Sequence, residues 1–236
     1  MKRIKPYIEN KYLVTNVDKQ RFLCSFKNLL VPDENGENGH YYVSSIYFDT
    51  DNFDFYQDKL EGEFFKLKIR IRRYSQDSEN WVSPKLELKI KHSDNTIKYS
   101  KAITEEEVKR LSASSISGYE VLKIFNFDKR IPKEYLLGRV FKAVTEIIYD
   151  RDAYLFLAVP DFRITFDYRI CIDNLLESGR QKAYLPEINN IFELKTNLKI
   201  PDLFLEWLKK NEINQEHVSK YSLSLEKIIR NLYSVG

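Results

Sequence analysis

The stretch from Lys66 to Arg72 reads KLKIRIR, a strict alternation of basic and aliphatic residues. Successive side chains of an extended strand point to opposite faces, so all the basic side chains share one face and the aliphatic ones share the other. A row of like charges repels itself and costs stability unless an anion neutralises it. The stretch therefore predicts a strand with a basic face made of Lys66, Lys68, Arg70 and Arg72.

A similar alternation of polar and apolar residues recurs along the chain and predicts further strands. These are Ile8–Val14, Tyr41–Asp49, Leu86–Lys91, a stretch ending in Tyr149–Tyr154, Phe162–Ile170 and Ile191–Thr196. A Glu-x-Lys pattern occurs in three of them, as Glu9/Lys11, Glu87/Lys89 and Glu193/Lys195. Because the whole chain has a formal net charge of only +3, the predicted strand faces concentrate its positive charge.

Helical spacing of apolar residues predicts several helices between and after these strands. They are Val17–Leu30 behind Asn16 as N-cap, a helix opened by Thr104, a segment around Tyr119–Phe125, a helix from Pro201 and a final one over Val218–Leu232. Thr104 and Glu107 have the spacing of a capping box.

The composition is that of a soluble globular protein, with 236 residues, 43% of them hydrophobic and 31% charged. No linker divides the chain, so we expect one domain over residues 1–236. The longest apolar run, Ala153–Val159, is too short to cross a membrane, and no secretory signal is recognisable, so we expect a cytoplasmic protein. Cys24 and Cys171 do not have the spacing of a zinc site or a disulfide framework.

Two interpretations of the charged strand faces are open. Each face can be the solvated side of a half-buried antiparallel sheet. Alternatively, the strands close into a barrel with the charged faces inward and the apolar faces covered by helices. The recurrence of the pattern favours the barrel, whose interior would bind a linear polyanion. Phosphate chains suit it because Arg grips phosphate bidentately, and the few carboxylates would hold Mg²⁺ or Mn²⁺.

Eight short motifs resemble, in the same order, those of the VTC domain of polyphosphate polymerases, within the triphosphate tunnel metalloenzymes. They are Glu9-x-Lys11-Tyr12, Ser44–Thr50 followed by Lys59, Leu60 and Gly62, the basic run from Lys66 to Tyr74, Leu86-Glu87-x-Lys89, Tyr149-x-Arg151-x-Ala153-Tyr154, Arg163-Ile164-Thr165-x-Asp167, Glu193-x-Lys195 and Ser219-Lys220-Tyr221. The likeness covers nearly the whole chain.

This resemblance implies an α+β fold, an antiparallel eight-stranded β-barrel tunnel with flanking helices. It also implies a polymerase that transfers the γ-phosphate of ATP to a growing inorganic polyphosphate chain, with Mn²⁺ or Mg²⁺ as cofactor. The catalytic residues would be Lys11, Arg70, Arg72, Lys89, Arg151, Arg163 and Lys195, the substrate-binding residues Lys66, Lys68, Lys91, Lys98, Ser219 and Lys220, and the metal ligand Glu193.

The chain departs from the family pattern at two positions. Tyr7 stands where the family usually has Arg, and Ser100 replaces the second residue of a basic pair that begins at Lys98, with Lys101 as a possible stand-in. Simpler roles also remain open from the sequence: Arg151 as half of a surface ion pair, and Ser219 as a helix cap.

Other functions on the same scaffold also remain open. One is a metal-dependent tripolyphosphatase or nucleoside triphosphatase. Another is a non-catalytic module that binds polyphosphate or nucleic acid. Nucleic acid is not an expected partner, because the residues between the cations of KLKIRIR are aliphatic and offer no base-stacking surface.

Overall fold

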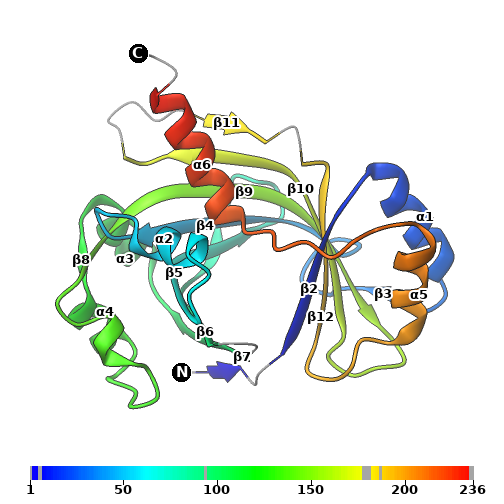
Figure 1. Cartoon of the computed structure of the whole chain (residues 1–236), viewed down its shortest axis with the longest axis horizontal. Coiled ribbons are helices and arrows are strands. Elements are labelled where there is room, and N and C mark those ends of the chain that lie inside the picture. Colours follow the sequence, from blue (N-terminus) through cyan, green and yellow to red (C-terminus); the bar gives the residue numbers. More distant parts are fainter. Residues whose placement is uncertain (1, 5–6, 93–94, 177–181, 186–187, 234–236) are drawn as a thin grey trace.

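The computed structural model describes residues 2–4, 7–92, 95–176, 182–185 and 188–233. Its main feature is one antiparallel sheet that curls around a central space (Figure 1). Eight long strands form it in the order β7-β6-β5-β4-β9-β10-β12-β2. Their bounds are β2 (Ile8–Val14), β4 (His40–Asp49), β5 (Phe65–Ser75), β6 (Val82–His92), β7 (Asn95–Ala102), β9 (Val140–Phe156), β10 (Arg163–Asn174) and β12 (Asn190–Thr196).

The two edges of the sheet belong to neighbouring segments of the chain. The short strand β1 (Lys2–Ile4) pairs with β7 at one edge, whereas β2, which begins at Ile8, forms the other edge beside β12. Four residues span at most about 14 Å, so the sheet must curl for both pairings to form. This confirms the expected antiparallel eight-stranded tunnel. Three short strands extend the wall: β3 (Leu30–Pro32) and β8 (Ile116–Ser117) pair with β9, and β11 (Lys182–Tyr184) pairs with β10.

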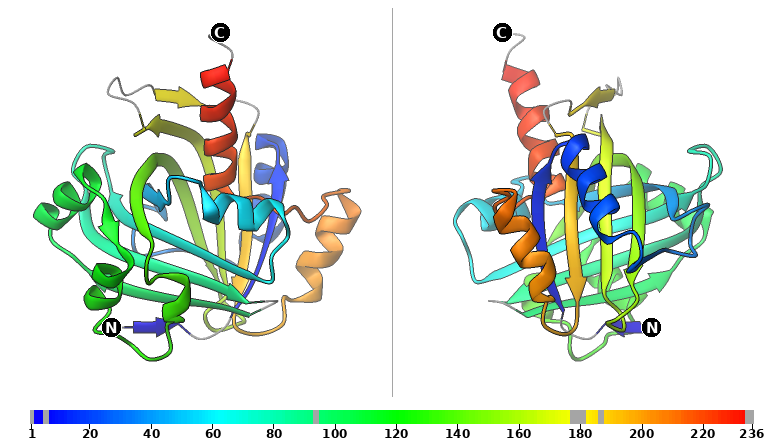
Figure 2. Two further views of the ribbon diagram at one scale, coloured as in Figure 1. Left: turned by 60° about the vertical axis from the view of Figure 1, so that its left-hand side comes forward. Right: turned by 90° about the vertical axis from the view of Figure 1, so that its right-hand side faces the viewer.

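Most helices lie outside the curled sheet (Figures 1 and 2), whereas the final helix begins against its inner face, where Tyr221 stacks on Tyr47 of β4. The helices are α1 (Asn16–Phe26), α2 (Asp54–Leu60), α3 (Glu105–Ala113), α4 (Gly118–Ile124), the 3₁₀ helix η1 (Lys133–Tyr135), α5 (Asp202–Lys210) and α6 (Lys220–Tyr233). The capping box at Thr104 is confirmed. The prediction for Asn16 was wrong: Thr15 is the N-cap, because its hydroxyl accepts the Asp18 N–H, and the helix ends at Phe26 rather than at Leu30.

The hydrophobic residues are buried in three clusters between the sheet and the helices. The aliphatic face of β5 packs in one cluster with residues of α2, α3 and α4. A second cluster joins α6 to β4 and β9, and a third, rich in Phe, joins α1 and α5 to β2, β10 and β12. Figure 2 shows α1 and α5 side by side over their part of the sheet. Because the first and third clusters use the outer faces of the strands, the charged faces point inward. The second cluster lies on that inward face, since it contains Tyr47 and Tyr149, and Tyr221 of α6 stacks on Tyr47.

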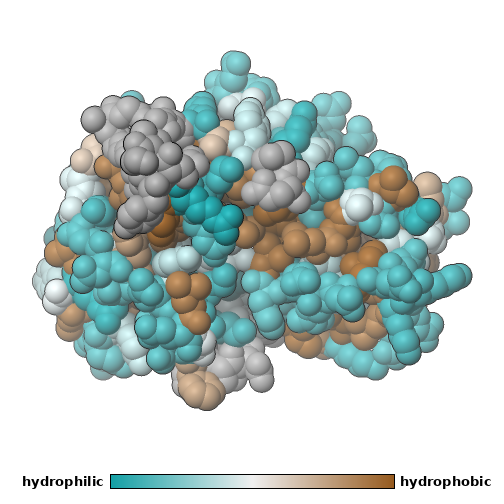
Figure 3. All heavy atoms as spheres, turned by 45° about the horizontal axis from the view of Figure 1, so that its top comes forward, coloured by the Kyte–Doolittle hydropathy of each residue, from teal (hydrophilic) through white to brown (hydrophobic). Residues whose placement is uncertain are grey.

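The molecular surface is mostly hydrophilic on the face seen in Figure 3, where hydrophobic side chains gather in a band. Within the described ranges, none of the helices has the length and apolar character needed to span a membrane.

Candidate functional site

A narrow cavity of about 140 Å³ lies on the inner side of the sheet, and we call it the tunnel. Within the described part of the chain, ten basic side chains and only two carboxylates, Glu9 and Glu193, line it. The basic residues are Lys11, Lys68, Arg70, Arg72, Lys89, Lys98, Arg151, Arg163, Lys195 and Lys220, and the other lining residues are Tyr7, Tyr47, Tyr74, Tyr149, Thr165 and Ser219. The tunnel is therefore built to receive an anion.

The structure brings together nearly all the side chains expected at the site. All seven expected catalytic residues line the tunnel, as do Glu193 and four of the six expected substrate-binding residues. Lys66 and Lys91 do not line it, and Lys91 is exposed. They are cross-strand partners two residues beyond the Lys68–Lys89 pair, so they point to the same face but lie past the end of the cavity.

One wall of the tunnel holds a buried carboxylate between two cations. Glu87 of β6 is 1% exposed. Arg70 approaches it within 2.7 Å, and Lys98 of β7 forms a second ion pair with it. Burial opposes ionisation, but the nearby charges of Arg70, Arg72 and Lys98 hold the pKa of Glu87 well below its usual range. Burial lowers the pKa of Lys98 to about 8.

The opposite wall repeats this arrangement with other residues. Asp167 of β10 is fully buried, and Arg151 of β9 grips it bidentately, with Nε and one terminal nitrogen 2.6 and 2.7 Å from its two oxygens. Lys220 Nζ lies 2.5 Å from Asp167 Oδ2. Burial opposes ionisation here too, yet Arg151 and Lys220 keep the pKa of Asp167 far below normal. Glu87 and Asp167 are therefore engaged in orienting cations of the tunnel wall.

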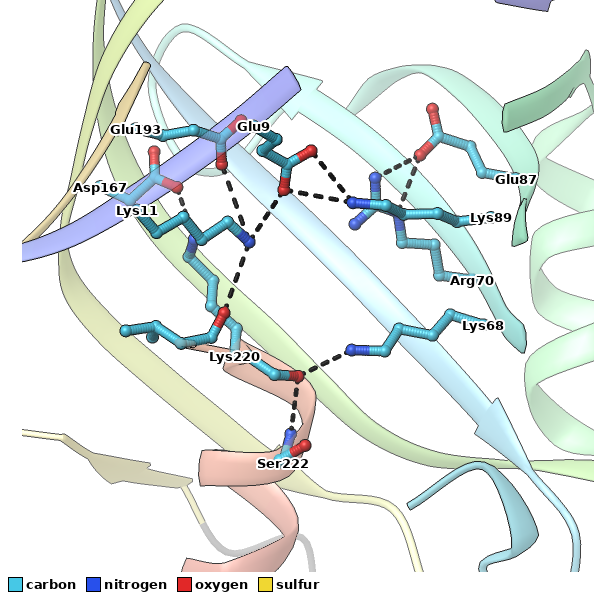
Figure 4. A network of polar contacts seen from close by, with 12 residues as sticks. Glu9, Lys11, Lys68, Arg70, Glu87, Lys89, Asp167, Glu193, Lys220 and Ser222 are labelled. Atoms are coloured by element: carbon cyan, nitrogen blue, oxygen red, sulfur yellow. Dashed lines mark hydrogen bonds and ion pairs between the residues drawn. The ribbon is translucent and has the colours of Figure 1, made fainter. Parts of the chain in front are cut away.

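The two remaining carboxylates meet at one ammonium group. Lys11 Nζ lies 3.0 Å from Glu9 and 3.8 Å from Glu193, and Lys89 Nζ lies 3.0 Å from Glu9 (Figure 4). The contact between Lys89 and Glu9 joins β6 to β2, strands from opposite halves of the sheet order. Burial and the charges of Lys11, Lys89 and Lys195 act in opposite directions on Glu9, and the charges prevail, so its pKa is well below the ordinary value.

These two carboxylates fit a divalent cation that arrives with its substrate. No group of three or more His, Cys, Asp or Glu side chains suited to a metal exists among the described residues. Mg²⁺, however, is commonly bound by one or two carboxylates together with substrate phosphates and water. Glu9 and Glu193 supply hard oxygen donors on the tunnel wall, beside the cations that would hold those phosphates.

Three tunnel cations have no carboxylate within ion-pairing distance among the described residues. Lys68 Nζ donates to Ser219 Oγ at 2.8 Å, and Arg72 donates to Ser45 Oγ and the Tyr149 hydroxyl, each at 3.2 Å. Lys195 Nζ lies 3.7 Å from the centre of the Tyr7 ring. Burial, together with the neighbouring cations, lowers the pKa of Lys68 well below the ordinary lysine value. Burial lowers the pKa of Lys195 to about 8.

The first residues of α6 close against the tunnel wall. Ser219 caps the helix by accepting the Ser222 N–H at 3.3 Å, and its hydroxyl also receives Lys68. Lys11 Nζ donates to the Val218 carbonyl at 3.5 Å. Figure 4 shows the Lys68 side chain pointing toward this end of α6, whereas Lys220, the first residue of the helix, extends its side chain away from it toward Asp167. The open role of Ser219 as a helix cap is thus confirmed, and the same residue lines the tunnel.

A wider chamber of about 700 Å³ adjoins the tunnel and shares Tyr74, Lys98 and Arg163 with it. Its other walls are mainly uncharged. They comprise Asn35, Tyr41, Ser75, Gln76, Val82, Ser83, Lys85, Glu87, Ser100 and Ala102. We call this space the vestibule. Ser100, one of the two departures from the family pattern, faces it.

Sequence reasoning missed the tyrosine hydroxyls and Thr165 of the tunnel. Tyr47 accepts a hydrogen bond from Arg70 at 3.2 Å, and Tyr149 accepts one from Arg72. The pattern of charged residues on the strand faces does not reveal these side chains, because they are uncharged. The alternation itself places Tyr149 on the same face as Arg151 and Thr165 on the same face as Arg163, so this signal was available.

The chain belongs to the VTC domain family, whose family model matches residues 6–229. A comparison with curated proteins gave no match. Similar folds occur in a "putative adenylate cyclase" from Bacillus halodurans, at 18% identity and a TM-score of 0.53, covering 93% of this chain and 96% of that one.

Two further solved structures are similar over their whole length. HpAC1 from Hippeastrum, described as a "putative adenylyl cyclase" with a dominant triphosphatase activity, has 12% identity and a TM-score of 0.52, covering 95% of this chain and 96% of its own. PH1819 from Pyrococcus horikoshii OT3 has 16% identity and a TM-score of 0.50, covering 94% and 99%. Together these structures show that the fold is that of the triphosphate tunnel proteins.

Proposed function

We propose that this protein is a metal-dependent polyphosphate polymerase that transfers the γ-phosphate of ATP to a growing inorganic polyphosphate chain. The observation that carries the proposal is the convergence of ten cations on one narrow tunnel, three of them without a carboxylate partner among the described residues. A compact ligand could contact only a few of these groups, whereas a linear triphosphate can follow the row.

The donor would lie with its phosphates in the tunnel and its nucleoside in the vestibule. The tunnel is narrow and strongly basic, which suits the phosphates, while the adjoining vestibule is wider and mainly uncharged. Tyr74 lies at their junction and offers an aromatic ring next to Lys98 and Arg163. The α-phosphate would then be closest to the vestibule and the γ-phosphate closest to Lys11.

The transfer requires no protein nucleophile. A terminal oxygen of the acceptor chain attacks the γ-phosphorus in line, a new P–O bond forms, and the bond to the β–γ bridging oxygen breaks, so ADP leaves with that electron pair. Arg72, Lys68 and Lys195 would stabilise the negative charge on the transferred group, because no carboxylate neutralises them. Glu9 and Glu193 would hold a divalent cation, which neutralises charge on the phosphate oxygens when bound.

The second candidate is a metal-dependent tripolyphosphatase or nucleoside triphosphatase, in which water replaces the acceptor chain. It is favoured by the triphosphatase activity described for the similar structure from Hippeastrum. The two candidates share the donor site and differ only in the acceptor.

One assay distinguishes them. The protein is incubated with ATP and Mn²⁺ or Mg²⁺, and ADP, orthophosphate and long anionic polymer are measured separately. The proposal predicts ADP and polymer in step, with little orthophosphate. ADP with an equal amount of orthophosphate and no polymer identifies a nucleoside triphosphatase. No ADP at all contradicts the polymerase and the nucleoside triphosphatase, and a parallel incubation with inorganic tripolyphosphate, in which orthophosphate is measured, tests the tripolyphosphatase.

A further inference from the structure

Thr165 of β10 is a tunnel residue that the charge pattern does not reveal. It is 3% exposed, and it lines the cavity beside Arg163, which is two residues earlier on the same strand face. The register places it between Ala153 of β9 and Glu193 of β12. Thr165 therefore lies in the central part of the basic wall.

The hydroxyl of Thr165 has no hydrogen-bond partner among the described residues. A buried hydroxyl without a partner destabilises a fold, because it loses its bonds to water and gains none in return. Valine has nearly the same shape and suits a strand equally well. The chain nevertheless has a hydroxyl at this position.

A second unsatisfied donor lies on the same strand face. Arg163 donates from a terminal nitrogen to Asp33, at 2.7 Å, and to the Tyr41 hydroxyl, but its Nε is buried and unpaired. Two donors, two residues apart on a wall of cations, thus lack acceptors within the described part of the chain. Both lack the same kind of group, an oxygen acceptor, and an anionic chain in the tunnel would supply one.

We propose that the Thr165 hydroxyl is a phosphate-binding donor of the tunnel wall, hydrogen-bonded to a non-bridging oxygen of the triphosphate. This proposal rests on the proposed function, since it takes the triphosphate as the tunnel ligand. The hydroxyl donates while the phosphate oxygen accepts, and no covalent bond changes. Thr165 then contributes to binding while it weakens the ligand-free fold.

These opposite effects separate the proposal from a structural role. Thr165→Val removes the hydroxyl and keeps the shape. We expect the affinity for inorganic tripolyphosphate, measured by isothermal titration calorimetry, to fall at least about tenfold, the equivalent of about 1.4 kcal/mol. The melting temperature without ligand should stay the same or rise. Thr165→Ser keeps the hydroxyl and should restore most of the affinity.

The matched control is Thr145→Val on β9. Thr145 is also a fully buried threonine, but its hydroxyl donates to the Asp173 carbonyl at 3.1 Å and bonds to Ser224 at 2.7 Å, and it does not line the tunnel. This variant should lower the melting temperature and leave the affinity unchanged.

Three results overturn the proposal. Wild-type affinity in Thr165→Val shows that the hydroxyl does not touch the ligand. A loss of melting temperature as large as that of Thr145→Val shows that the hydroxyl is satisfied within the protein. If the wild-type protein itself binds no tripolyphosphate, the proposed function fails and the role of Thr165 with it.

Discussion

The Tyr221 hydroxyl donates to the buried carboxylate of Asp49 at 2.6 Å, and this bond ties the start of α6 to the end of β4. Asp49 also accepts the N–H groups of Thr50, Phe55 and Tyr56, so the same carboxylate holds the first turn of α2. The Tyr221 ring stacks on Tyr47 at a centroid distance of 5.3 Å. Tyr221 follows directly after Ser219 and Lys220, so the bond fixes the end of α6 that lines the tunnel.

Tyr221→Phe tests this link. It keeps the ring and removes the hydroxyl, so the buried Asp49 Oδ2 loses the shorter of its two hydrogen bonds and keeps only the longer one from the Tyr56 N–H. We expect a loss of about 1–3 kcal/mol in the free energy of unfolding and a weaker affinity for tripolyphosphate. Both are measured on the same protein, by urea unfolding and by calorimetric titration.

Tyr56→Phe is the control for this substitution. Tyr56 belongs to the same hydrophobic cluster as Tyr221 but does not line the tunnel. It should bind tripolyphosphate as the wild type does. Normal binding by Tyr221→Phe would show that the tunnel does not depend on this bond.

Arg72 tests the role of the cations without a carboxylate partner. Arg72→Met removes a charge that no carboxylate balances, so the ligand-free protein should lose little stability, while tripolyphosphate affinity should fall about 10- to 100-fold, as for a lost hydrogen bond to a charged group. Lys91→Met removes the same charge from the same strand-face pattern outside the tunnel. Equal losses of affinity in the two variants would indicate a general charge effect.

Lys98 gives the binding a pH dependence. Its pKa of about 8, lowered by burial, means that it loses its proton as the pH rises through 8 in the free protein. An anion in the tunnel favours the charged form and raises this pKa. ATP binding at pH 8.5 should therefore take up protons and weaken as the pH rises from 7 to 9.5.

Proton uptake is measured by calorimetry in two buffers of different ionisation enthalpy. ATP suits this test because its terminal phosphate, with a pKa near 6, is already ionised at this pH. Lys98→Met should reduce the uptake. Binding enthalpies that are independent of the buffer at pH 8.5 would contradict the prediction.

The buried carboxylates make the free energy of unfolding depend on pH in the acid range. The pKa values of Glu9, Glu87 and Asp167 are lowered in the folded state, where neighbouring cations outweigh the effect of burial. Their stabilisation is fully present above the unfolded-state values of about 4 to 4.5 and is lost as the pH falls through the lower, folded-state values. Urea unfolding at pH 7, 5, 4 and 3 should show most of the loss below pH 5. A free energy of unfolding that stays constant down to pH 3 would refute this.

The alternation in the sequence predicted which side chains share a strand face. It did not predict which of them lie within the length of the tunnel. Lys66 and Lys68 share a face, and only the neighbouring strands decide that the tunnel ends between them. The sequence also did not predict which side chains form ion pairs across the cavity. The contact between Lys89 and Glu9 requires β6 and β2 to meet across a curled sheet, and their separation in the chain does not encode that distance.

The closure of the sheet depends on a strand too short for the pattern to reveal. β1 has three residues, fewer than the four to eight from which alternation is recognised. The helix that begins after Thr104 was predicted correctly, because the capping box of Thr104 and Glu107 depends on local sequence and not on tertiary contacts. Local chemistry was thus predictable, while long-range geometry came only with the structure.

The most direct test of the central claim is a crystal structure of the protein with inorganic tripolyphosphate. The account predicts one linear phosphate chain inside the tunnel, with its oxygens in contact with Arg72, Lys68 and Lys195. Tripolyphosphate bound only on the outer surface, with the tunnel side chains paired among themselves as in the free protein, would contradict it.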